Sequence, residues 1–403
     1  MNNKTIVILF VAITAVLVFT GCTGEKISQV AQDNTTEVST SNDKNVENAT
    51  NVSTSNDKSG ETRIVTDSAG RQVAVPIKVE RVADTWMGHN EVLAMLGADD
   101  RLVATMFSSK KRPWAYKVCP AYYNAVTLSP TYDVEALLAT KPDVVFMPSR
   151  DKNIEKVSAL GVPVVEVSFT DFDSMKKCFS DTANALGDEE ALERSQKYNA
   201  YLDSKLELVR NISSRIPYDE RPKVLHLVSL SPLCVDGGGN IISDWIEAAG
   251  GINAAEEVKG GIMQEVSMEQ ILKWNPDMII LSVNAKSEEK EKIMNSESWK
   301  KVKAVQNNNV FVNPEGAFIW SRAGAEQALQ IQWAAKTINP DTFQSIDINN
   351  ETKWFYKTFF LITSLQMRMF KNFECTGSRL IRNFSVNFGF FRGIKLFCKA
   401  EIH

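Results

Sequence analysis

Two stretches of the chain repeat one pattern, and this pattern decides the fold. Residues 134–146 read VEALLATKPDVVF, and residues 268–280 read MEQILKWNPDMII. Glu, Leu, Pro and Asp recur at a constant offset of 134 residues. In each copy an amphipathic helix ends before proline, which cannot continue it, and a buried strand follows. The repeat therefore predicts two similar lobes, each containing a helix and a buried strand in this order.

Short β-branched segments alternate with amphipathic segments on both sides of the two repeats. This alternation is typical of parallel α/β units. Between the lobes, residues 188–215 are polar but carry apolar residues at helical spacing, so we predict one long helix there. Two helices joined by a kink are the alternative. The expected strands are 79–83, 144–147, 162–167, 224–228, 278–283 and 310–312, and the expected shorter helices are 91–96, 134–139 and 268–274.

The composition excludes several classes of protein. The 403 residues include 45 Lys and Arg against 49 Asp and Glu, a net charge of −4, whereas a nucleic-acid-binding protein would carry a basic excess. Hydrophobic residues make up 44% of the chain, too many for a mainly disordered protein. Only one long apolar run is present, which excludes a polytopic membrane protein.

The N-terminus has the pattern of an export signal. Residues 5–20 form a nearly unbroken apolar run that ends in Phe19-Thr20-Gly21-Cys22, which resembles a lipobox whose cysteine is lipidated. An uncleaved N-terminal anchor is the alternative. Residues 23–62 are rich in Ser, Thr, Asn and charged residues and contain an exact repeat, so we expect a disordered tether. Both interpretations place the rest of the chain outside the cytoplasmic membrane and attached to its outer face.

Cysteine and histidine are too sparse for the usual metal motifs. The cysteines other than Cys22 are Cys119, Cys178, Cys234, Cys375 and Cys398, and no two have the CxxC spacing. We expect the three in the globular region to be buried free thiols. With three histidines in the chain, a histidine-rich metal site is excluded as well.

Five motifs, in order, resemble class III substrate-binding proteins of ABC importers. They are DSAGR at 67–71 with the following VP and VERV, the block 91–98, the block 135–143, AAGGIN at 248–253, and VSMEQI at 266–271. The resemblance covers about residues 63–345. It implies two Rossmann-like lobes joined by one long α-helix, with the ligand cleft between them. It also implies a non-enzymatic monomer without a covalently bound cofactor, which delivers a metal chelate of the iron–siderophore type to a permease dimer with a cytoplasmic ATPase.

The resemblance and the repeats together suggest a division of the chain. We expect a signal peptide at 1–22, a tether at 23–62, an N-terminal lobe at 63–172, and a linking helical region at 173–217. A C-terminal lobe at 218–345 and a C-terminal helix with a tail at 346–403 complete it. Residues 361–403 depart from the family, because they hold seven basic residues, two acidic residues and seven Phe. We suspect a frame-shifted or foreign end there.

The resemblance gives the two repeated glutamates a role. Glu135 and Glu269 match the positions at which a glutamate of each lobe docks with arginines of the permease. Equivalent carboxylates on related lobes suit a partner of two similar subunits. The alternative needs no partner, because acidic residues are also favoured at helix N-termini by the helix dipole.

Candidate ligand-binding residues lie where loops should follow the strands of each lobe. Aromatic side chains could stack on an organic chelate, and arginine could pair with its anionic groups. We also consider His89 the one protein side chain placed to reach a metal's open coordination position. The candidates are Trp86, Met87, His89, Trp114, Tyr116, Tyr132 and Arg150 in the first lobe, and Ser231, Trp320 and Arg322 in the second.

Other functions are weaker interpretations. Residues 236–240 read DGGGN but lack the Lys-Ser/Thr of a phosphate-binding loop, so we predict a turn before a helix. A chelatase-like enzyme with a related fold would lack the export signal, and an extracytoplasmic sensor would lack a permease. The sequence leaves the ligand open among a siderophore, haem, cobalamin, a nickel or cobalt chelate, and a molybdate-type oxyanion.

Overall fold

The computed structural model describes residues 61–282 and 287–360. The predicted export signal with Cys22, the predicted tether up to residue 60 and the tail from residue 361 lie outside the described residues, whereas Thr62, predicted as the end of the tether, already belongs to the first strand. Cys119, Cys178 and Cys234 are buried free thiols, as expected. Within the described ranges, no helix is both long enough and apolar enough to cross a membrane.

The first lobe is built on a five-stranded parallel sheet in the order β5-β4-β3-β6-β7. The chain passes from β3 to its neighbour β4 in one direction across the sheet, and from β6 to its neighbour β7 in the other direction. At such a reversal of strand order, a crevice is expected outside the carboxyl ends of β3 and β6. A hairpin of β1 (Thr62–Thr66) and β2 (Gln72–Pro76) precedes this sheet. The elements are β3 (Val82–Asp84), α1 (Met87–Met95), β4 (Leu102–Thr105), α2 (Pro113–Val118), β5 (Val126–Thr127), α3 (Val134–Ala139), β6 (Val144–Pro148), α4 (Ile154–Ala159) and β7 (Val164–Val167).

The second lobe is built on a mixed six-stranded sheet in the order β11-β9-β8-β12-β13, with β10 also paired to β8. The strands β8, β12 and β13 are parallel, whereas β9 and β11 run antiparallel to their neighbours. The elements are β8 (Lys223–Leu230), β9 (Leu233–Val235), α7 (Ile241–Ala248), β10 (Ile252–Asn253), β11 (Gln264–Glu265), α8 (Met268–Trp274), β12 (Met278–Leu281), α9 (Ser287–Asn295), α10 (Lys303–Gln306) and β13 (Val310–Val312).

The repeated Pro-Asp dipeptide performs the same task in both lobes. Asp143 Oδ2 accepts a hydrogen bond from the backbone N–H of Arg81 at 2.8 Å, directly before β3. Asp277 Oδ2 accepts one from the N–H of Lys223 at 2.8 Å, at the start of β8. Each aspartate therefore ties the beginning of one strand to the beginning of its neighbour and fixes the register between them. The prediction of two related lobes is confirmed.

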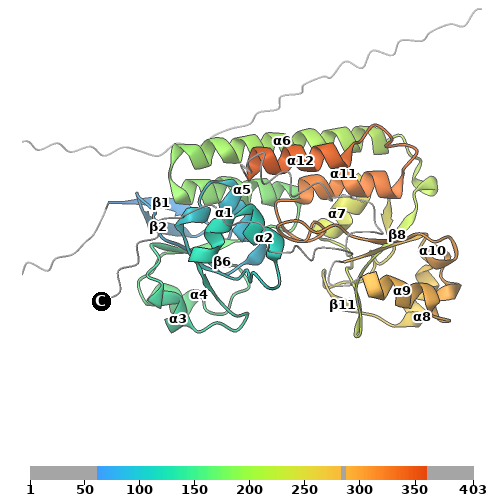
Figure 1. Cartoon of the computed structure of the whole chain (residues 1–403), viewed down its shortest axis with the longest axis horizontal. Helices are drawn as coiled ribbons and strands as arrows, with labels where there is room; N and C mark the ends of the chain where they lie inside the picture. The colour runs from blue at the N-terminus through green and yellow to red at the C-terminus, as the bar shows by residue number, and fades with distance from the viewer. Residues whose placement is uncertain (1–60, 283–286, 361–403) are drawn as a thin grey trace, which may run out of the picture. The chain divides into compact units, whose positions relative to one another are not determined.

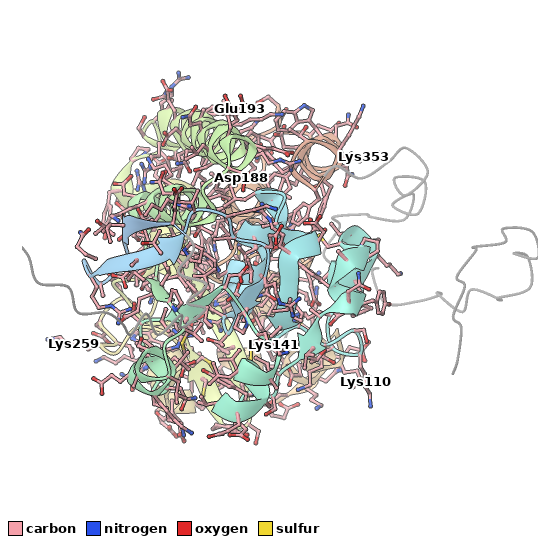
Figure 2. All side chains as sticks on the ribbon, turned by 90° about the vertical axis from the view of Figure 1, so that its left-hand side faces the viewer. Lys110, Lys141, Asp188, Glu193, Lys259 and Lys353 are labelled. Atoms are coloured by element: carbon pink, nitrogen blue, oxygen red, sulfur yellow. The ribbon has the colours of Figure 1, made fainter. Side chains whose placement is uncertain are left out.

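The turn before each repeated proline also has one conformation. Lys141 and Asn275 both adopt positive φ angles, 50° and 44°, which end helices α3 and α8. Lys141, labelled in Figure 2, lies on the surface of the first lobe. A left-handed residue is uncommon outside glycine, so its presence at equivalent positions shows how closely the two lobes match.

A single long helix joins the lobes, as predicted. Helix α6 (Glu189–Ser213) follows α5 (Phe172–Leu186), and α11 (Gln327–Ile338) and α12 (Ile348–Phe359) pack beside it (Figure 1). Asp188 caps α6 by accepting a hydrogen bond from Ala191 N at 2.9 Å, and Asp188 also pairs with Arg101 of the first lobe at 2.8 Å. Figure 2 labels Asp188 and Glu193 where α6 begins.

The helices share one hydrophobic core with the first lobe. Tyr198 of α6 is buried, stacks on Phe179 of α5 with ring centroids 3.9 Å apart, and donates a hydrogen bond to Ala325 O at 2.7 Å. The same cluster extends through α7, α11 and α12, whereas two smaller clusters fill the other faces of the two sheets. Residues before α11 are therefore anchored against the linking helix.

Two of the displaced boundaries lie near the candidate site, and one of them changes it. Strand β3 covers Val82–Asp84, later than the predicted 79–83. Helix α1 begins at Met87, four residues before the predicted start at Glu91. The early start is possible because α1 is buried along nearly its whole length, so it shows little amphipathic periodicity from which to locate its beginning.

Candidate functional site

The first component of the candidate site lies at the carboxyl end of β3. Asp84, the last residue of β3, is buried, and its Oδ1 accepts a hydrogen bond from the backbone N–H of Trp86 at 2.8 Å. Trp86 is partly exposed and packs against Phe169, with ring centroids 4.8 Å apart. Met87 follows it at the beginning of α1 with 36% of its surface exposed. Trp86 and Met87 are therefore both accessible to a ligand.

Polar side chains connect this loop to the end of β6. Tyr132 donates a hydrogen bond to Asp151 Oδ2 at 2.7 Å, and Thr85 donates to the same oxygen at 3.2 Å. Burial and the hydrogen bond to Asp151 raise the pKa of Tyr132 above its ordinary value, so the hydroxyl stays protonated. Arg150, next to Asp151, is exposed. Thr85 and Tyr132 therefore meet at Asp151, and Trp86 and Arg150 are neighbours of Thr85 and Asp151 along the chain, after the carboxyl ends of β3 and β6.

The position of His89 in the structure contradicts its predicted roles as a metal ligand and as a ligand contact. Because α1 begins early, His89 lies inside the helix and is fully buried. Its Nδ1 donates to Asp84 at 2.9 Å and its Nε2 donates to the Thr182 hydroxyl at 2.8 Å. Thr182 in turn donates to Cys178 O at 2.7 Å, so the Thr182 hydroxyl accepts from the ring. Both ring nitrogens are therefore occupied by protein partners.

The ionisation of His89 follows from these contacts. Burial lowers the pKa of His89, but the charge and hydrogen bond of Asp84 outweigh this effect and raise the pKa to about 9. His89 is thus an imidazolium in a buried ion pair. A protonated histidine has no lone pair left for a metal ion. Within the described parts of the chain, no group of three or more His, Cys, Asp or Glu residues could hold a metal.

The second component of the site is an arginine in front of the second sheet. One guanidinium nitrogen of Arg322, Nη1, pairs with Asp236 Oδ1 at 3.1 Å. Its Nη2 is buried and has no hydrogen-bond partner among the described residues. Asp236, directly after β9, is fully buried and also accepts hydrogen bonds from His226 Nδ1 at 2.6 Å and from Met263 N at 2.8 Å.

The ionisation states in this cluster are set by burial and by charge. Burial alone would raise the pKa of Asp236. The contacts with His226, Arg322 and the N–H of Met263 lower this pKa by more, so it lies below its ordinary value. Burial lowers the pKa of His226 more than its contact with Asp236 raises it, so His226 is neutral near pH 7. The cluster is therefore a carboxylate held between an arginine and a neutral histidine.

Backbone contacts bring the two components together. Gly88 of α1 lies against the segment after Arg322, and a Cβ atom on Gly88 would come within 2.0 Å of Ala323 O. Glu91 Oε2 accepts a hydrogen bond from Ala325 N at 2.8 Å. The beginning of α1, which carries Trp86 and Met87, is thus packed directly against the segment that carries Arg322.

A buried carboxyl pair lies beneath this contact. Glu326 accepts hydrogen bonds from Ala317 N at 3.0 Å, from Phe318 N at 2.9 Å and from Tyr356. Burial raises the pKa of Glu326 to about 7, and burial together with the charge of Glu326 raises the pKa of Glu91 well above its ordinary value. Because Glu326 accepts from three donors, Glu91 is the member of the pair that keeps its proton to higher pH.

The remaining candidates lie in other places. Trp114 is partly exposed with Lys117 4.8 Å from its ring, and Ser231 is exposed in the turn between β8 and β9, where its N–H donates to Ser229 Oγ at 3.1 Å. Both stay predictions.

Two aromatic candidates are contradicted by burial. Trp320 has no exposed surface, because the segment before Arg322 turns into the core around α11. Tyr116 is buried as well, and its hydroxyl donates to Phe107 O at 2.8 Å. Of the predicted pair Trp320 and Arg322, only the arginine reaches the surface.

The repeated glutamates are exposed at the first turns of α3 and α8. Sharing a proton with the Asp133 carboxyl, together with hydrogen bonds from the backbone and from Lys156, lowers the pKa of Glu135 to about 2. The backbone and Ser267 lower the pKa of Glu269 as well. Lys156 lies 3.1 Å from Glu135. Both glutamates are therefore charged and accessible on the two lobes.

Sequence reasoning missed Asp236 and Met263 as partners of the site. Asp236 was assigned only to a turn, and the turn is present, because Asn240 caps α7 by accepting from Ile242 N at 2.9 Å. Gly237 is required there, since a Cβ atom would lie 2.1 Å from Val258 O. The available signal was His226, a titratable residue in the middle of an apolar strand, which requires a buried partner.

The fold and these surfaces define a two-lobed substrate-binding protein of an ABC importer. A family model described as "Periplasmic binding protein" matches residues 87–317. The chain therefore belongs to this family.

Several curated relatives cover most of the described chain. The molybdate-binding protein MolA of Haemophilus influenzae is 26% identical over 321 residues, covering 74% of this chain and 91% of MolA. The uncharacterized ABC transporter substrate-binding lipoprotein YvrC of Bacillus subtilis is 23% identical, covering 70% and 86%. The high-affinity heme uptake system protein IsdE of Staphylococcus aureus is 29% identical, covering 54% and 77%.

Solved structures share the fold. A periplasmic solute binding protein of Veillonella parvula matches with a TM-score of 0.65 and 27% identity, covering 76% of this chain and 96% of that one. Molybdate-bound MolA matches with a TM-score of 0.67 and 22% identity, covering 75% and 98%. Helicobacter pylori CeuE in complex with Ni and His matches with a TM-score of 0.65 and 21% identity, covering 77% of this chain and 99% of CeuE. These relatives are transport binding proteins, in agreement with the expected class.

Proposed function

We propose that this binding protein captures a negatively charged, metal-containing ligand outside the cytoplasmic membrane and delivers it to a permease dimer. The observation that carries the proposal is the hydrogen bonding of Arg322. Its Nη1 is held by Asp236, while its Nη2 is buried without a partner among the described residues. An unpaired guanidinium nitrogen is costly to bury, and an anionic group of a ligand would complete its hydrogen bonds.

The first-lobe residues support an organic component in the ligand. Trp86 and Met87 offer apolar surface beside Arg322, and Tyr132 and Arg150 add polar groups on the same edge of the sheet. A chelate of the iron–siderophore type would use both kinds of contact. A molybdate-type oxyanion is the second candidate, because the relative MolA is a molybdate-binding protein. The heme uptake protein IsdE and the Ni–His complex of CeuE place haem and a nickel chelate in the same panel.

The test is a titration of the protein, freed of any bound ligand, with each member of the panel. The probes are a ferric siderophore, haemin, cyanocobalamin, Ni²⁺ with histidine, and sodium molybdate, followed by tryptophan fluorescence and by calorimetry. We expect one probe to bind with a stoichiometry of one and Arg322→Lys to weaken that binding. An equal affinity of Arg322→Lys and the unchanged protein would contradict the role of Arg322. No response to any probe would contradict the importer function.

Docking to the permease is proposed for Glu135 and Glu269. Both are charged, exposed and placed at the same position of related lobes, which suits a permease of two similar subunits. Replacing both by Lys should abolish uptake in cells while the affinity of the isolated protein for its ligand stays unchanged. The matched control is Glu193→Lys on the linking helix. Uptake at the normal rate by the double variant would refute the docking role.

We also propose that Cys22 carries a lipid that anchors the protein to the outer face of the membrane. The lipobox-like sequence and the polar residues 23–62 support this, and the relative YvrC is described as a lipoprotein. Two acyl chains suffice for stable anchoring. Cys22→Ser should lose incorporation of radiolabelled palmitate. Unchanged labelling of the variant would exclude this site.

A further inference from the structure

A buried histidine–aspartate pair stands behind the candidate ligand contacts in each lobe. In the first lobe, His89 Nδ1 binds Asp84 at 2.9 Å, and the other oxygen of Asp84 accepts from Trp86 N. In the second lobe, His226 Nδ1 binds Asp236 at 2.6 Å, and the other oxygen of Asp236 accepts from Arg322. All four of these histidine and aspartate side chains are fully buried.

We infer that His226 is a positioning residue, which orients Asp236 so that Arg322 presents its Nη2 to an anionic ligand. The inference rests on the proposed function only for the statement that Nη2 meets a ligand. The orientation of Arg322 by His226 and Asp236 is a property of the protein without ligand.

The His226 ring is held rigidly. It lies in the middle of β8, where it is paired with Ile280 of the neighbouring strand β12. Its ring meets Trp245 of α7 edge to face, with centroids 5.7 Å apart and planes at 86°. The Asp236 N–H also donates to His226 O at 3.2 Å. The main chain and the ring of His226 are both held by these contacts. The Nδ1 donor of His226 therefore defines where the Asp236 carboxylate lies.

The Asp236 carboxylate in turn defines the orientation of the Arg322 guanidinium. Asp236 Oδ2 is occupied by His226, so Oδ1 is the oxygen left for Arg322 and for Met263 N. A carboxylate free to rotate could take both guanidinium nitrogens in the bidentate arrangement that arginine favours. With one oxygen engaged elsewhere, Arg322 is paired through Nη1, and Nη2 keeps its hydrogen-bonding capacity. Only 11% of the Arg322 side chain is exposed, so few other orientations are open to it.

A merely structural histidine would behave differently. If His226 only filled space in the core, an apolar side chain of similar size would change the stability and leave Arg322 in place. The positioning role requires the hydrogen bond that Nδ1 donates. Asparagine places its amide nitrogen near the position of Nδ1, glutamine places it near that of Nε2, and leucine has no donor. These three substitutions therefore separate the effect of the hydrogen-bond donor from the effect of side-chain volume.

The experiment compares His226→Asn, His226→Leu and His226→Gln in the full chain, with two readouts. The first is the Nε–H resonance of Arg322 in protein labelled with ¹⁵N-arginine, assigned by its loss in Arg322→Lys. We expect the resonance to keep its position in His226→Asn and to shift or broaden in the Leu and Gln variants. If His226→Leu fails to fold, His226→Gln supplies the comparison. His89→Gln, the equivalent change in the first lobe, should leave the resonance unchanged.

The second readout is the affinity for sodium molybdate or the ferric siderophore, whichever binds the unchanged protein. We expect the Leu and Gln variants to bind roughly tenfold or more weakly, the usual effect of losing a hydrogen bond to a charged group, and His226→Asn to restore binding. An Arg322 resonance that is unchanged in both the Leu and Gln variants would overturn the inference. A shifted resonance with unchanged affinity would confirm the positioning and contradict instead the ligand contact of Arg322 in the proposed function.

Discussion

The buried carboxyl pair of Glu91 and Glu326 makes the stability of this protein depend on pH in a predictable direction. Burial raises the pKa of both groups above the ordinary value of 4.5. The folded protein therefore retains protons that the unfolded chain has released. The stabilisation is fully present below about pH 4.5, the unfolded pKa, and is lost as the pH rises through the folded values, which begin at about 7 for Glu326.

The magnitude follows from the number of protons. While the folded state holds one proton more than the unfolded state, the free energy of unfolding falls by about 1.4 kcal/mol per pH unit. Glu91→Gln imitates the neutral, protonated acid, because its carbonyl oxygen can accept from Ala325 N as the carboxyl oxygen does. The variant should therefore lose the part of this slope that Glu91 contributes, so its unfolding free energy should fall less steeply with pH than that of the unchanged protein, by up to about 1.4 kcal/mol per pH unit.

The assay is urea unfolding followed by circular dichroism at pH 6, 7 and 8, with Glu193→Gln as the control on the surface of α6. The control should follow the unchanged protein at every pH, because Glu193 is exposed. His89 also loses stabilisation as the pH rises toward 9, but it does so equally in all three proteins and cancels in the comparison. Parallel slopes for Glu91→Gln and the unchanged protein would refute the retained proton.

Three further predictions test the packing and charges of the site. Gly88→Ala should lower the free energy of unfolding by about 1–3 kcal/mol, measured by urea unfolding, because its Cβ atom would overlap Ala323 O; an unchanged midpoint would contradict that close approach. Trp320→Phe should lower the stability by about 1–3 kcal/mol, because the side chain is buried, and should leave the ligand affinity within about threefold; a large loss of affinity without a loss of stability would restore Trp320 as a ligand contact. In a proton NMR titration, His89 should titrate near pH 9 and His226 below 6.5, and two titrations near 6.5 would contradict both assignments.

The two-lobed fold could be predicted from the sequence because the repeats carry strong local signals. A proline after a helix and an aspartate before an apolar strand each have one physical meaning, and both recur at the same spacing. The long helix α6 was predictable because its apolar residues face one side over many turns. Helix α1 was harder to locate, since both of its sides are buried and its beginning has no side-chain cap.

The site was only partly predictable for a related reason. The sequence shows which residues follow a strand, but not which way each side chain turns. His89 and Trp320 lie close to exposed candidates along the chain and are nevertheless buried. Arg322 could be predicted as an anion contact, whereas its dependence on Asp236 and His226 could not, because these residues come from β8 and from the turn after β9.

The linking helix has a consequence for the kinetics of transport. Bending α6, which runs without interruption from Glu189 to Ser213, would break its internal hydrogen bonds and its packing against α5 and α11. A helix of this kind restricts large hinge motions between the two lobes. We therefore expect ligand association at rates set by diffusion, with no slow closing step, and affinity set by how slowly the ligand leaves. On the proposed function, release of the ligand then requires work that a permease performs on the two lobes.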